Sequence, residues 1–248
     1  MKVSIITISY NSEETIEDTI KSVVDQDYDN IEYIIIDGNS KDNTLQIIDK
    51  YKGGISKIVS EQDQGIYDAM NKGVQMATGD LIGILNSDDL YASNQVVSSV
   101  VNQIGDAQCL YSDLVYVERE NTEQVTRYWK SGEYQPGWFK KGWMPPHPTF
   151  FVRKDCYDKF GLYSLELKSS ADYELMLRFI HKNKISVKYL PQTTIKMRVG
   201  GQSNVSIKNR LAANKEDRTA WKMNGLSPGT ATVRKPLSKL TQFFKKDK

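Results

Sequence analysis

Short apolar runs of strand length alternate with amphipathic stretches through the first hundred residues. The runs are rich in β-branched residues, which favour strands, and they cover residues 3–10, 31–36, 55–60 and 81–88. The stretches between them repeat apolar residues at helical spacing, as Ile16, Ile20, Val23 and Val24 do. This order predicts an α/β fold, with a mostly parallel central sheet and helices on both of its faces. We expect the first helix to begin at Asn11, with Glu14 completing a capping box.

The pattern changes after about residue 105. Residues 109–117 and 124–129 predict two strands joined by a polar turn, and residues 130–148 are irregular and rich in Trp, Gly and Pro. Further helices are expected at 172–182 and 207–224. We therefore divide the chain into a first half, residues 1–105, a second half of the same domain, residues 106–225, and a tail, residues 226–248.

Composition narrows the choice of partners. The chain has 248 residues and a net charge of +2, but six of its basic residues lie in the last fifteen positions. The remaining body is acidic, which argues against nucleic acid as a partner. The two cysteines lack metal-site spacing, and neither a signal peptide nor an apolar stretch of membrane-spanning length is visible. We expect a cytoplasmic protein.

Two adjacent carboxylates, Asp88 and Asp89, follow the apolar run at 81–87 directly. Ligands of open α/β sheets bind beyond the carboxyl ends of the strands. A carboxylate pair there needs a counter-charge, most often a hard divalent cation, and such an ion can neutralise a diphosphate. The alternative is that the pair only caps a turn.

Other acidic residues are expected at the same edge. Asp37 ends the second strand, where it either accepts a hydrogen bond from a base N–H, such as the uracil imide, or caps the loop that follows. Glu61, Asp63 and Lys72 bracket a loop-to-helix junction that suits a ribose or base edge. Simple N-capping by Asp63 is the alternative.

The second half offers three more candidates. Asp172 opens a predicted helix, either as a general base or as a residue that only stabilises the helix N-terminus. His147 lies in a Pro-rich loop and either contacts a metal or phosphate or belongs to a surface turn. Trp143 either stacks on a sugar ring or pins its loop to the core.

Several common motifs are absent. The sequence contains no G-x-G-x-x-G, no G-x-x-x-x-G-K-[ST] and no G-x-S-x-G. These absences exclude the dinucleotide fingerprint, the P-loop and the nucleophile elbow.

Taken together, these segments resemble glycosyltransferase family 2, the inverting, metal-dependent enzymes of the GT-A fold. The resemblance covers about residues 1–205. It rests on the order and spacing of five segments: residues 3–11, residues 34–44, the loop and helix at 60–73, Leu85-Asn86-Ser87-Asp88-Asp89, and residues 171–175.

The resemblance implies a nucleotide-diphosphate sugar donor, usually a UDP-sugar, bound by residues 1–105, and an acceptor bound by residues 106–225. In this reading Asp37 and Asp63 hold the uracil and ribose, with Glu61, Lys72 and Asp89 also on the donor side. Asp88 approaches Mn²⁺ or Mg²⁺, and Asp172 deprotonates the acceptor hydroxyl.

The sequence also departs from the family in two respects. Asn86 stands where many members have the first Asp of a D-x-D motif, so metal binding is expected to rest on Asp88. The Q-x-x-R-W signature of processive synthases is absent, which favours transfer of a single sugar.

The tail predicts a basic amphipathic helix, with Pro236 in its first turn and Leu237, Leu240, Phe243 and Phe244 on one face. Such a helix suits peripheral contact with the inner face of the plasma membrane, and the alternative is a solvated lysine tail. Relatives of this size often build O-antigen, capsule or exopolysaccharide units, and the resemblance therefore implies an acceptor linked to undecaprenyl diphosphate.

Two rival functions stay open. A metal-dependent phosphatase or nucleotidyltransferase also places carboxylates at strand ends, but residues 37–40 lack the phosphatase pattern and residues 9–14 lack a Gly-rich basic loop. A non-catalytic sugar-nucleotide binder gains some support from Asn86.

Overall fold

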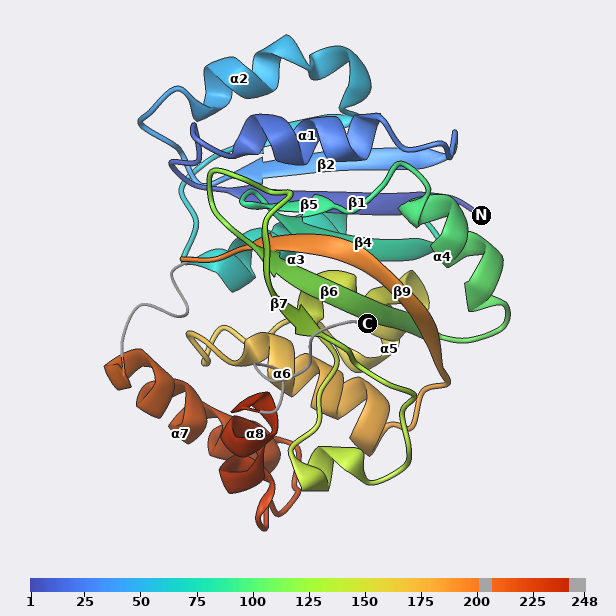
Figure 1. Cartoon of the computed structure of the whole chain (residues 1–248), viewed down its shortest axis with the longest axis vertical. Helices are drawn as coiled ribbons and strands as arrows, with labels where there is room; N and C mark the ends of the chain where they lie inside the picture. The colour runs from blue at the N-terminus through green and yellow to red at the C-terminus, as the bar shows by residue number, and fades with distance from the viewer. Residues whose placement is uncertain (201–206, 241–248) are drawn as a thin grey trace.

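The computed structural model describes residues 1–200 and 207–240, and within these residues nine strands form one sheet in the order β3-β2-β1-β4-β8-β6-β9-β5, with β7 paired to β6 (Figure 1). The strands are β1 (Val3–Ser9), β2 (Ile31–Asp37), β3 (Lys57–Ser60), β4 (Leu81–Asn86), β5 (Asp89–Tyr91), β6 (Cys109–Val117), β7 (Val125–Trp129), β8 (Phe151–Arg153) and β9 (Val187–Arg198).

Helices connect most of these strands. They are α1 (Ile16–Val24), α2 (Thr44–Lys50), α3 (Ile66–Met76), α4 (Val96–Ile104), α5 (Lys154–Phe160), α6 (Ala171–Met176), α7 (Ile207–Met223) and α8 (Ala231–Leu240). Shorter helical turns are η1 (Lys52–Gly54), η2 (Trp138–Lys141) and η3 (His147–Thr149), and the π-helical segment η4 (Leu177–Lys182) continues α6.

The predicted α/β fold is confirmed. Strands β3, β2, β1 and β4 pair in parallel, as does β6 with β9, whereas β8 joins the two groups through antiparallel pairs with β4 and β6. Side chains of β1 alternate between two cores: Val3 and Ile5 lie in one, and Ile6 and Ile8 lie in the other. Helices α1, α2 and α4 cover the first core, and α3, α5 and α6 cover the second.

The first helix begins later than its sequence predicts. Asn11 has a φ of 47°, a left-handed conformation that cannot continue a right-handed helix. Helix α1 therefore begins at Ile16, and its N-terminus has no side-chain cap, so the predicted capping box is wrong.

The last helix also differs from its prediction, because α8 begins at Ala231 rather than next to Pro236. Ala231 and Thr232 are buried, and the Lys235 ammonium lies 2.8 Å from the buried carboxylate of Asp217. The first half of this helix is therefore docked on the domain, near α7 at the end of the molecule opposite α1 and α2 (Figure 1). Phe243 and Phe244 lie outside the described residues.

A buried carboxylate ties the strands together at their amino-terminal ends. Glu32 on β2 accepts hydrogen bonds from the Ser4 hydroxyl on β1 at 2.6 Å and from the Thr78 N–H and hydroxyl, both at 2.7 Å, just before β4. Lys2 and Lys57 lie within 3.3 Å of the same carboxylate. Burial alone would raise the pKa of Glu32, but the hydrogen bonds outweigh burial and lower it to about 2.

We expect Glu32→Gln to lower the free energy of unfolding at pH 7 by about 2 to 3 kcal/mol. Because the folded pKa of about 2 lies below the ordinary value of 4.5, the wild type holds this stabilisation above pH 4.5 and loses it as the pH falls toward 2. Urea unfolding at several pH values should therefore show the two proteins converging in acid.

Asp49→Asn provides the control, because Asp49 pairs with Lys52 on the open surface and its loss should change stability little at any pH. A Glu32→Gln deficit that does not shrink in acid would contradict this account.

Candidate functional site

The carboxyl ends of four parallel strands meet at one edge of the sheet. The strand register pairs Ser9 with Asp37, Asp37 with Ser60, and Ile8 with Asn86. The fold therefore brings Asp37, the loop that holds Glu61 and Asp63, and the Asp88–Asp89 pair to the same edge, which is where ligands of open α/β sheets bind.

Asp37 is fully buried and organises the loops around it. One carboxylate oxygen accepts hydrogen bonds from the hydroxyls of Ser9, at 3.2 Å, and Ser40, at 2.5 Å. The other accepts from the Ser40 N–H at 3.0 Å and the Ser60 hydroxyl at 2.7 Å. A carboxylate has about four acceptor positions. These contacts occupy them all and match the loop-capping interpretation of Asp37 rather than contact with a base.

Asp63 lies beside Gly38, at the start of the loop after β2. A Cβ atom on Gly38 would lie 2.6 Å from Asp63 Oδ2 and 3.3 Å from the Tyr10 ring, so a larger residue there would require the Asp63 carboxylate to shift. Asp63 Oδ1 accepts the N–H of Gly65 at 2.8 Å, but Gly65 is itself the N-cap of α3 and no side chain caps that helix, so simple N-capping by Asp63 is wrong. The Tyr10 side chain is 57% exposed and available to a ligand.

Glu61 and Lys72 form an ion pair across the same junction, with 2.8 Å between ammonium and carboxylate. Lys72 also donates to the carbonyl of Gln62 at 3.2 Å and lies 3.5 Å from Asp68. The hydrogen bond that Lys72 donates to the Glu61 carboxylate raises the pKa of Lys72. Glu61 and Lys72 therefore join the loop before α3 to the helix itself.

The Asp88–Asp89 pair carries unsatisfied oxygens. Asp89 is fully buried, and its Oδ2 accepts a hydrogen bond from the Asn86 amide at 3.0 Å. Asp89 Oδ1 and Asn86 Oδ1 are buried without a hydrogen-bond partner. Burial raises the pKa of Asp88, and burial together with the charge of Asp88 raises that of Asp89 well above its usual range.

These oxygens suit a hard cation. Mg²⁺ and similar ions bind one or two carboxylates and take further ligands from substrate phosphates. Across residues 1–200 and 207–240, no three His, Cys, Asp or Glu side chains gather at a metal position. Asp88 and Asp89 do provide the one or two carboxylates that such an ion uses when phosphates supply further ligands.

Arg198, at the end of β9, supports the Asp88 loop and was not predicted from the sequence. Its buried guanidinium donates to the main-chain carbonyls of Asp88 at 3.1 Å and Arg119 at 3.0 Å, and it pairs with Asp18. The charges of Arg119 and Arg198 oppose the rise in the pKa of Asp88. A lone arginine near a strand end gives no signal in the sequence.

Asp172 is the second residue of α6 and is partly exposed. Its Oδ1 accepts a hydrogen bond from the Tyr67 hydroxyl on α3 at 3.2 Å. The start of α3 therefore contacts Asp172 through Tyr67 and follows the loop that holds Asp63.

His147 is buried rather than part of a surface turn, with 9% of its surface exposed. Its Nε2 lies 2.8 Å from the Tyr163 hydroxyl. Burial lowers the pKa of His147, and the nearby charge of Asp172 opposes that shift. The predicted histidine and the predicted base are thus close neighbours.

Trp143 packs in an aromatic cluster, with ring centroids 5.1 to 5.5 Å from those of Tyr111, Tyr134 and Phe139. Its indole N–H donates to the carbonyl of Ser131 at 2.9 Å. These contacts match the interpretation that Trp143 pins its loop to the core. An open depression of about 450 Å³ lies between the loops that follow β1 and β2. It is lined by Asn11, Glu13, Glu14, Lys41 and Asp42, none of them a predicted site residue.

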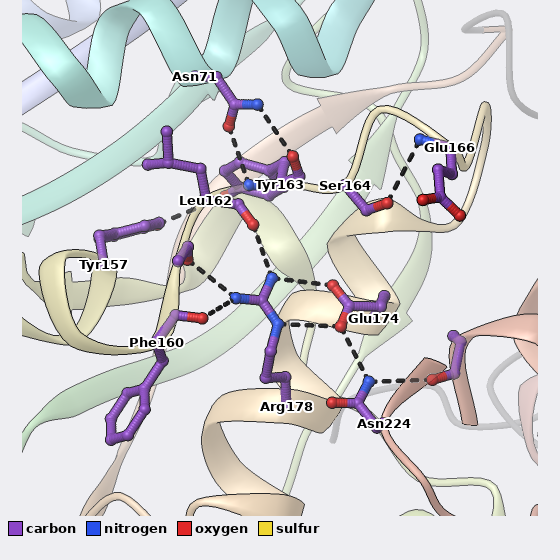
Figure 2. Close-up of polar contacts among 12 residues, drawn as sticks. Asn71, Tyr157, Phe160, Leu162, Tyr163, Ser164, Glu166, Glu174, Arg178 and Asn224 are labelled. Atoms are coloured by element: carbon purple, nitrogen blue, oxygen red, sulfur yellow. Dashed lines mark hydrogen bonds and ion pairs between the residues drawn. The ribbon is translucent and has the colours of Figure 1, made fainter. Parts of the chain in front are cut away.

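A largely buried arginine, Arg178, contacts the helix that carries Asp172 and the segment before that helix (Figure 2). The Arg178 guanidinium binds both oxygens of Glu174, at 2.9 Å each. It also donates to three successive carbonyls, those of Phe160, Gly161 (2.9 Å) and Leu162 (2.6 Å). All five of its N–H groups are thereby used. Asn224, after α7, donates to the same glutamate at 2.9 Å.

Comparison with known proteins identifies the family. A sequence model described as "Glycosyl transferase family 2" matches residues 4–161, well over half of the chain. The chain therefore belongs to glycosyl transferase family 2, as the resemblance predicted.

Individual relatives agree. The chain is 33% identical over 178 residues to an uncharacterized glycosyltransferase of Mycobacterium tuberculosis, covering 71% of this chain and 68% of that protein. It is 27% identical over 190 residues to a PGL/p-HBAD biosynthesis glycosyltransferase of Mycobacterium bovis, covering 75% and 73%.

Solved structures confirm the architecture. The crystal structure of S. aureus TarS 1–349 in complex with UDP-GlcNAc superposes with a TM-score of 0.70 at 18% identity, over 90% of this chain but only 65% of that one. The mannosyltransferase PcManGT from Pyrobaculum calidifontis, in complex with GDP-Man and Mn²⁺, gives a TM-score of 0.64 at 14% identity, covering 100% and 76%. At these identities the likeness shows the fold, which is the GT-A architecture expected from the sequence.

We expect Arg178→Lys to lower the free energy of unfolding by about 3 kcal/mol, because lysine has three donors for the five acceptors that Arg178 contacts and leaves the buried Glu174 poorly compensated. Urea unfolding measures the change. Lys154→Ala is the control, since its pair with Asp158 is much more exposed and should contribute little. Equal stability of Arg178→Lys and the wild type would show that the network does not brace α6.

Proposed function

We propose that the protein transfers one hexose or N-acetylhexosamine, with inversion, from a UDP-sugar to a saccharide linked to a lipid diphosphate. The product would belong to O-antigen, capsule or exopolysaccharide synthesis. The observation that carries the proposal is the group of unpaired buried oxygens on Asn86 and Asp89, beside Asp88, at the strand edge of a family 2 fold.

Asp63, rather than Asp37, is the better candidate for binding the nucleobase. Asp37 has its acceptor positions filled by three serines, whereas Asp63 Oδ2 points toward Gly38 beside the exposed Tyr10 ring. Uracil offers an imide N–H for a carboxylate and a flat face for an aromatic ring. Glu61 and Lys72 hold the shape of this loop through their ion pair.

Asp88 would hold a Mn²⁺ or Mg²⁺ ion, with Asn86 and Asp89 as further oxygen donors. When bound, such an ion acts as a Lewis acid that stabilises the negative charge on the departing diphosphate. Carboxylates bind a cation in their ionised form, and burial raises the pKa of both Asp88 and Asp89, so affinity for the ion should fall in acid.

On the acceptor side, Asp172 takes the proton from the acceptor hydroxyl as that oxygen attacks the anomeric carbon. The bond between the anomeric carbon and the UDP oxygen breaks on the opposite face, so the configuration inverts. Buried His147, next to Asp172, and Trp143 are proposed to shape the acceptor side.

We propose undecaprenyl diphosphate as the lipid and the inner face of the plasma membrane as the location. None of the described helices is long and apolar enough to cross a bilayer. Lys235 is unavailable to lipid because it pairs with Asp217 and covers the Tyr173 ring at 3.8 Å. Contact with the membrane would therefore rest on the residues that follow it.

The direct test of the function is a panel of UDP-glucose, UDP-galactose, UDP-GlcNAc and UDP-GalNAc, each with Mn²⁺ and synthetic undecaprenyl-diphosphate GlcNAc or GalNAc. Mass spectrometry should show one added sugar and equimolar UDP. Release of inorganic phosphate would favour the phosphatase alternative. Binding of UDP without any turnover would favour a non-catalytic binder.

We expect Asp172→Asn to lower turnover at least about 100-fold, because the amide cannot accept the acceptor proton. UDP binding, measured by calorimetry, should stay close to wild type because Asp172 does not lie on the donor side. Near-normal turnover of this variant would remove Asp172 from the mechanism.

We expect the full-length protein to float with anionic liposomes. A chain ending at residue 240 should not, because it lacks Phe243, Phe244 and three lysines. This endpoint keeps Lys235, whose removal would leave Asp217 buried without its partner. Equal flotation of both proteins would remove the tail as an anchor. Neutral liposomes serve as the control for charge.

A further inference from the structure

We infer that Tyr67 is a positioning residue that holds Asp172 in the orientation needed for proton transfer. The Tyr67 hydroxyl, on α3, donates to Asp172 Oδ1 at 3.2 Å, although the two residues lie 105 positions apart in the sequence. The inference rests on the proposed function, since it gives Tyr67 a role in the same reaction.

The Tyr67 phenol can only act as a donor to this carboxylate. Its side chain is buried, with 9% exposed, and burial raises its pKa far above the usual range, so it stays protonated at any working pH. Within the described residues, Asp172 Oδ2 accepts no hydrogen bond. The tyrosine therefore fixes one oxygen and leaves the other for an acceptor hydroxyl.

The Tyr67 ring is itself held in place. It stacks on the Tyr163 ring, with centroids 5.9 Å apart and planes 15° from parallel. Asn71, one helical turn after Tyr67, accepts the N–H of Tyr163 and donates to its carbonyl, both at 2.9 Å (Figure 2). Helix α3 thus contacts Tyr163 twice, through Asn71 on its main chain and through Tyr67 on its ring.

Tyr163 is connected back to the helix of Asp172. It follows directly after the three carbonyls at residues 160–162 that Arg178 binds, and Arg178 pairs with Glu174, two residues after Asp172 (Figure 2). The contacts close a ring from Asp172 through Tyr67, Tyr163, Arg178 and Glu174 to α6. We call the contacts of Tyr67, Tyr163, Arg178 and Glu174 the frame. The Tyr67 hydroxyl is the member of the frame that hydrogen-bonds to the Asp172 carboxylate.

A rigid frame matters because general-base catalysis depends on orientation. A displacement of about 1 Å at a reacting group can cost up to about 100-fold in rate. Tyr67→Phe removes only the hydroxyl and keeps the ring stacked on Tyr163, so it tests the hydrogen bond and not the packing.

The test measures UDP release from the four UDP-sugars of the panel, with Mn²⁺ and undecaprenyl-diphosphate GlcNAc. We expect Tyr67→Phe to lower kcat about 10- to 50-fold while KM for the donor stays within about twofold. Tyr157→Phe is the matched control. It removes another buried hydroxyl of the same core, 3.4 Å from that of Tyr163, and should leave kcat within about twofold.

A double-mutant cycle separates positioning from a structural role. In the Asp172→Asn background, adding Tyr67→Phe should lower the residual rate less than about twofold, because the hydroxyl acts through the carboxylate. Equal losses in both backgrounds, or near-wild-type kcat for Tyr67→Phe, would overturn the inference.

Failure of the inference can be told from failure of the proposed function. If the wild type releases no UDP from any of the four sugars, the proposed function fails and the role of Tyr67 fails with it. If the wild type is active and Asp172→Asn is equally active, sugar transfer stands, but Asp172 leaves the mechanism and the role of Tyr67 fails. If Asp172→Asn is inactive and Tyr67→Phe behaves like Tyr157→Phe, only the role of Tyr67 fails.

Discussion

Asp88 and Asp89 place two carboxylates side by side at the turn from β4 to β5, and Asp89 is fully buried. Burial raises the pKa of Asp88, and burial together with the charge of Asp88 raises that of Asp89 well above its usual range, so a nearby cation would stabilise the ionised pair. The guanidinium of Arg198 donates its hydrogen bonds to main-chain carbonyls and Asp18. It therefore only partly offsets the negative charge of Asp88 and Asp89. The unpaired oxygens of Asn86 and Asp89 are therefore the feature that a cation and a diphosphate would satisfy together.

The parallel register makes this arrangement useful. It aligns the ends of β1, β2, β3 and β4, and Asp37 accepts hydrogen bonds from the last residues of β1 and β3 and from Ser40 in the loop after β2. In the second half of the chain, Arg178 joins Glu174 in α6 to the main chain at Leu162. One group of buried contacts thus holds the proposed donor side, and a separate one holds the proposed base.

The fold was largely predictable because hydrophobic periodicity reports burial directly. Strands β2 and β6 agree with prediction within about one residue, and the α/β class is confirmed. The start of α1 was not predictable, because the left-handed turn at Asn11 arises from contacts with residues 40 and 41 of another loop. The start of α8 likewise depends on the buried pair of Lys235 with Asp217.

The sequence indicated which acidic residues lie at the candidate site, but not which contacts each of them makes there. Acidic residues after strands gave a signal, but the filled acceptor positions of Asp37 depend on three serines that only the fold assembles. Glu174 and Arg178 stand four positions apart, a visible helical pair, yet the three carbonyls bound by Arg178 leave no trace in the sequence. Tyr67 has no sequence signal at all.

Anomalous diffraction at the manganese absorption edge, from a crystal soaked with Mn²⁺ and UDP, tests the central claim most directly. The account predicts an anomalous peak within about 2.5 Å of an Asp88 oxygen, bridged to the diphosphate, with the uracil beside Asp63. A nucleotide bound at this edge with no manganese near Asp88, or manganese and UDP at separate places, would contradict it.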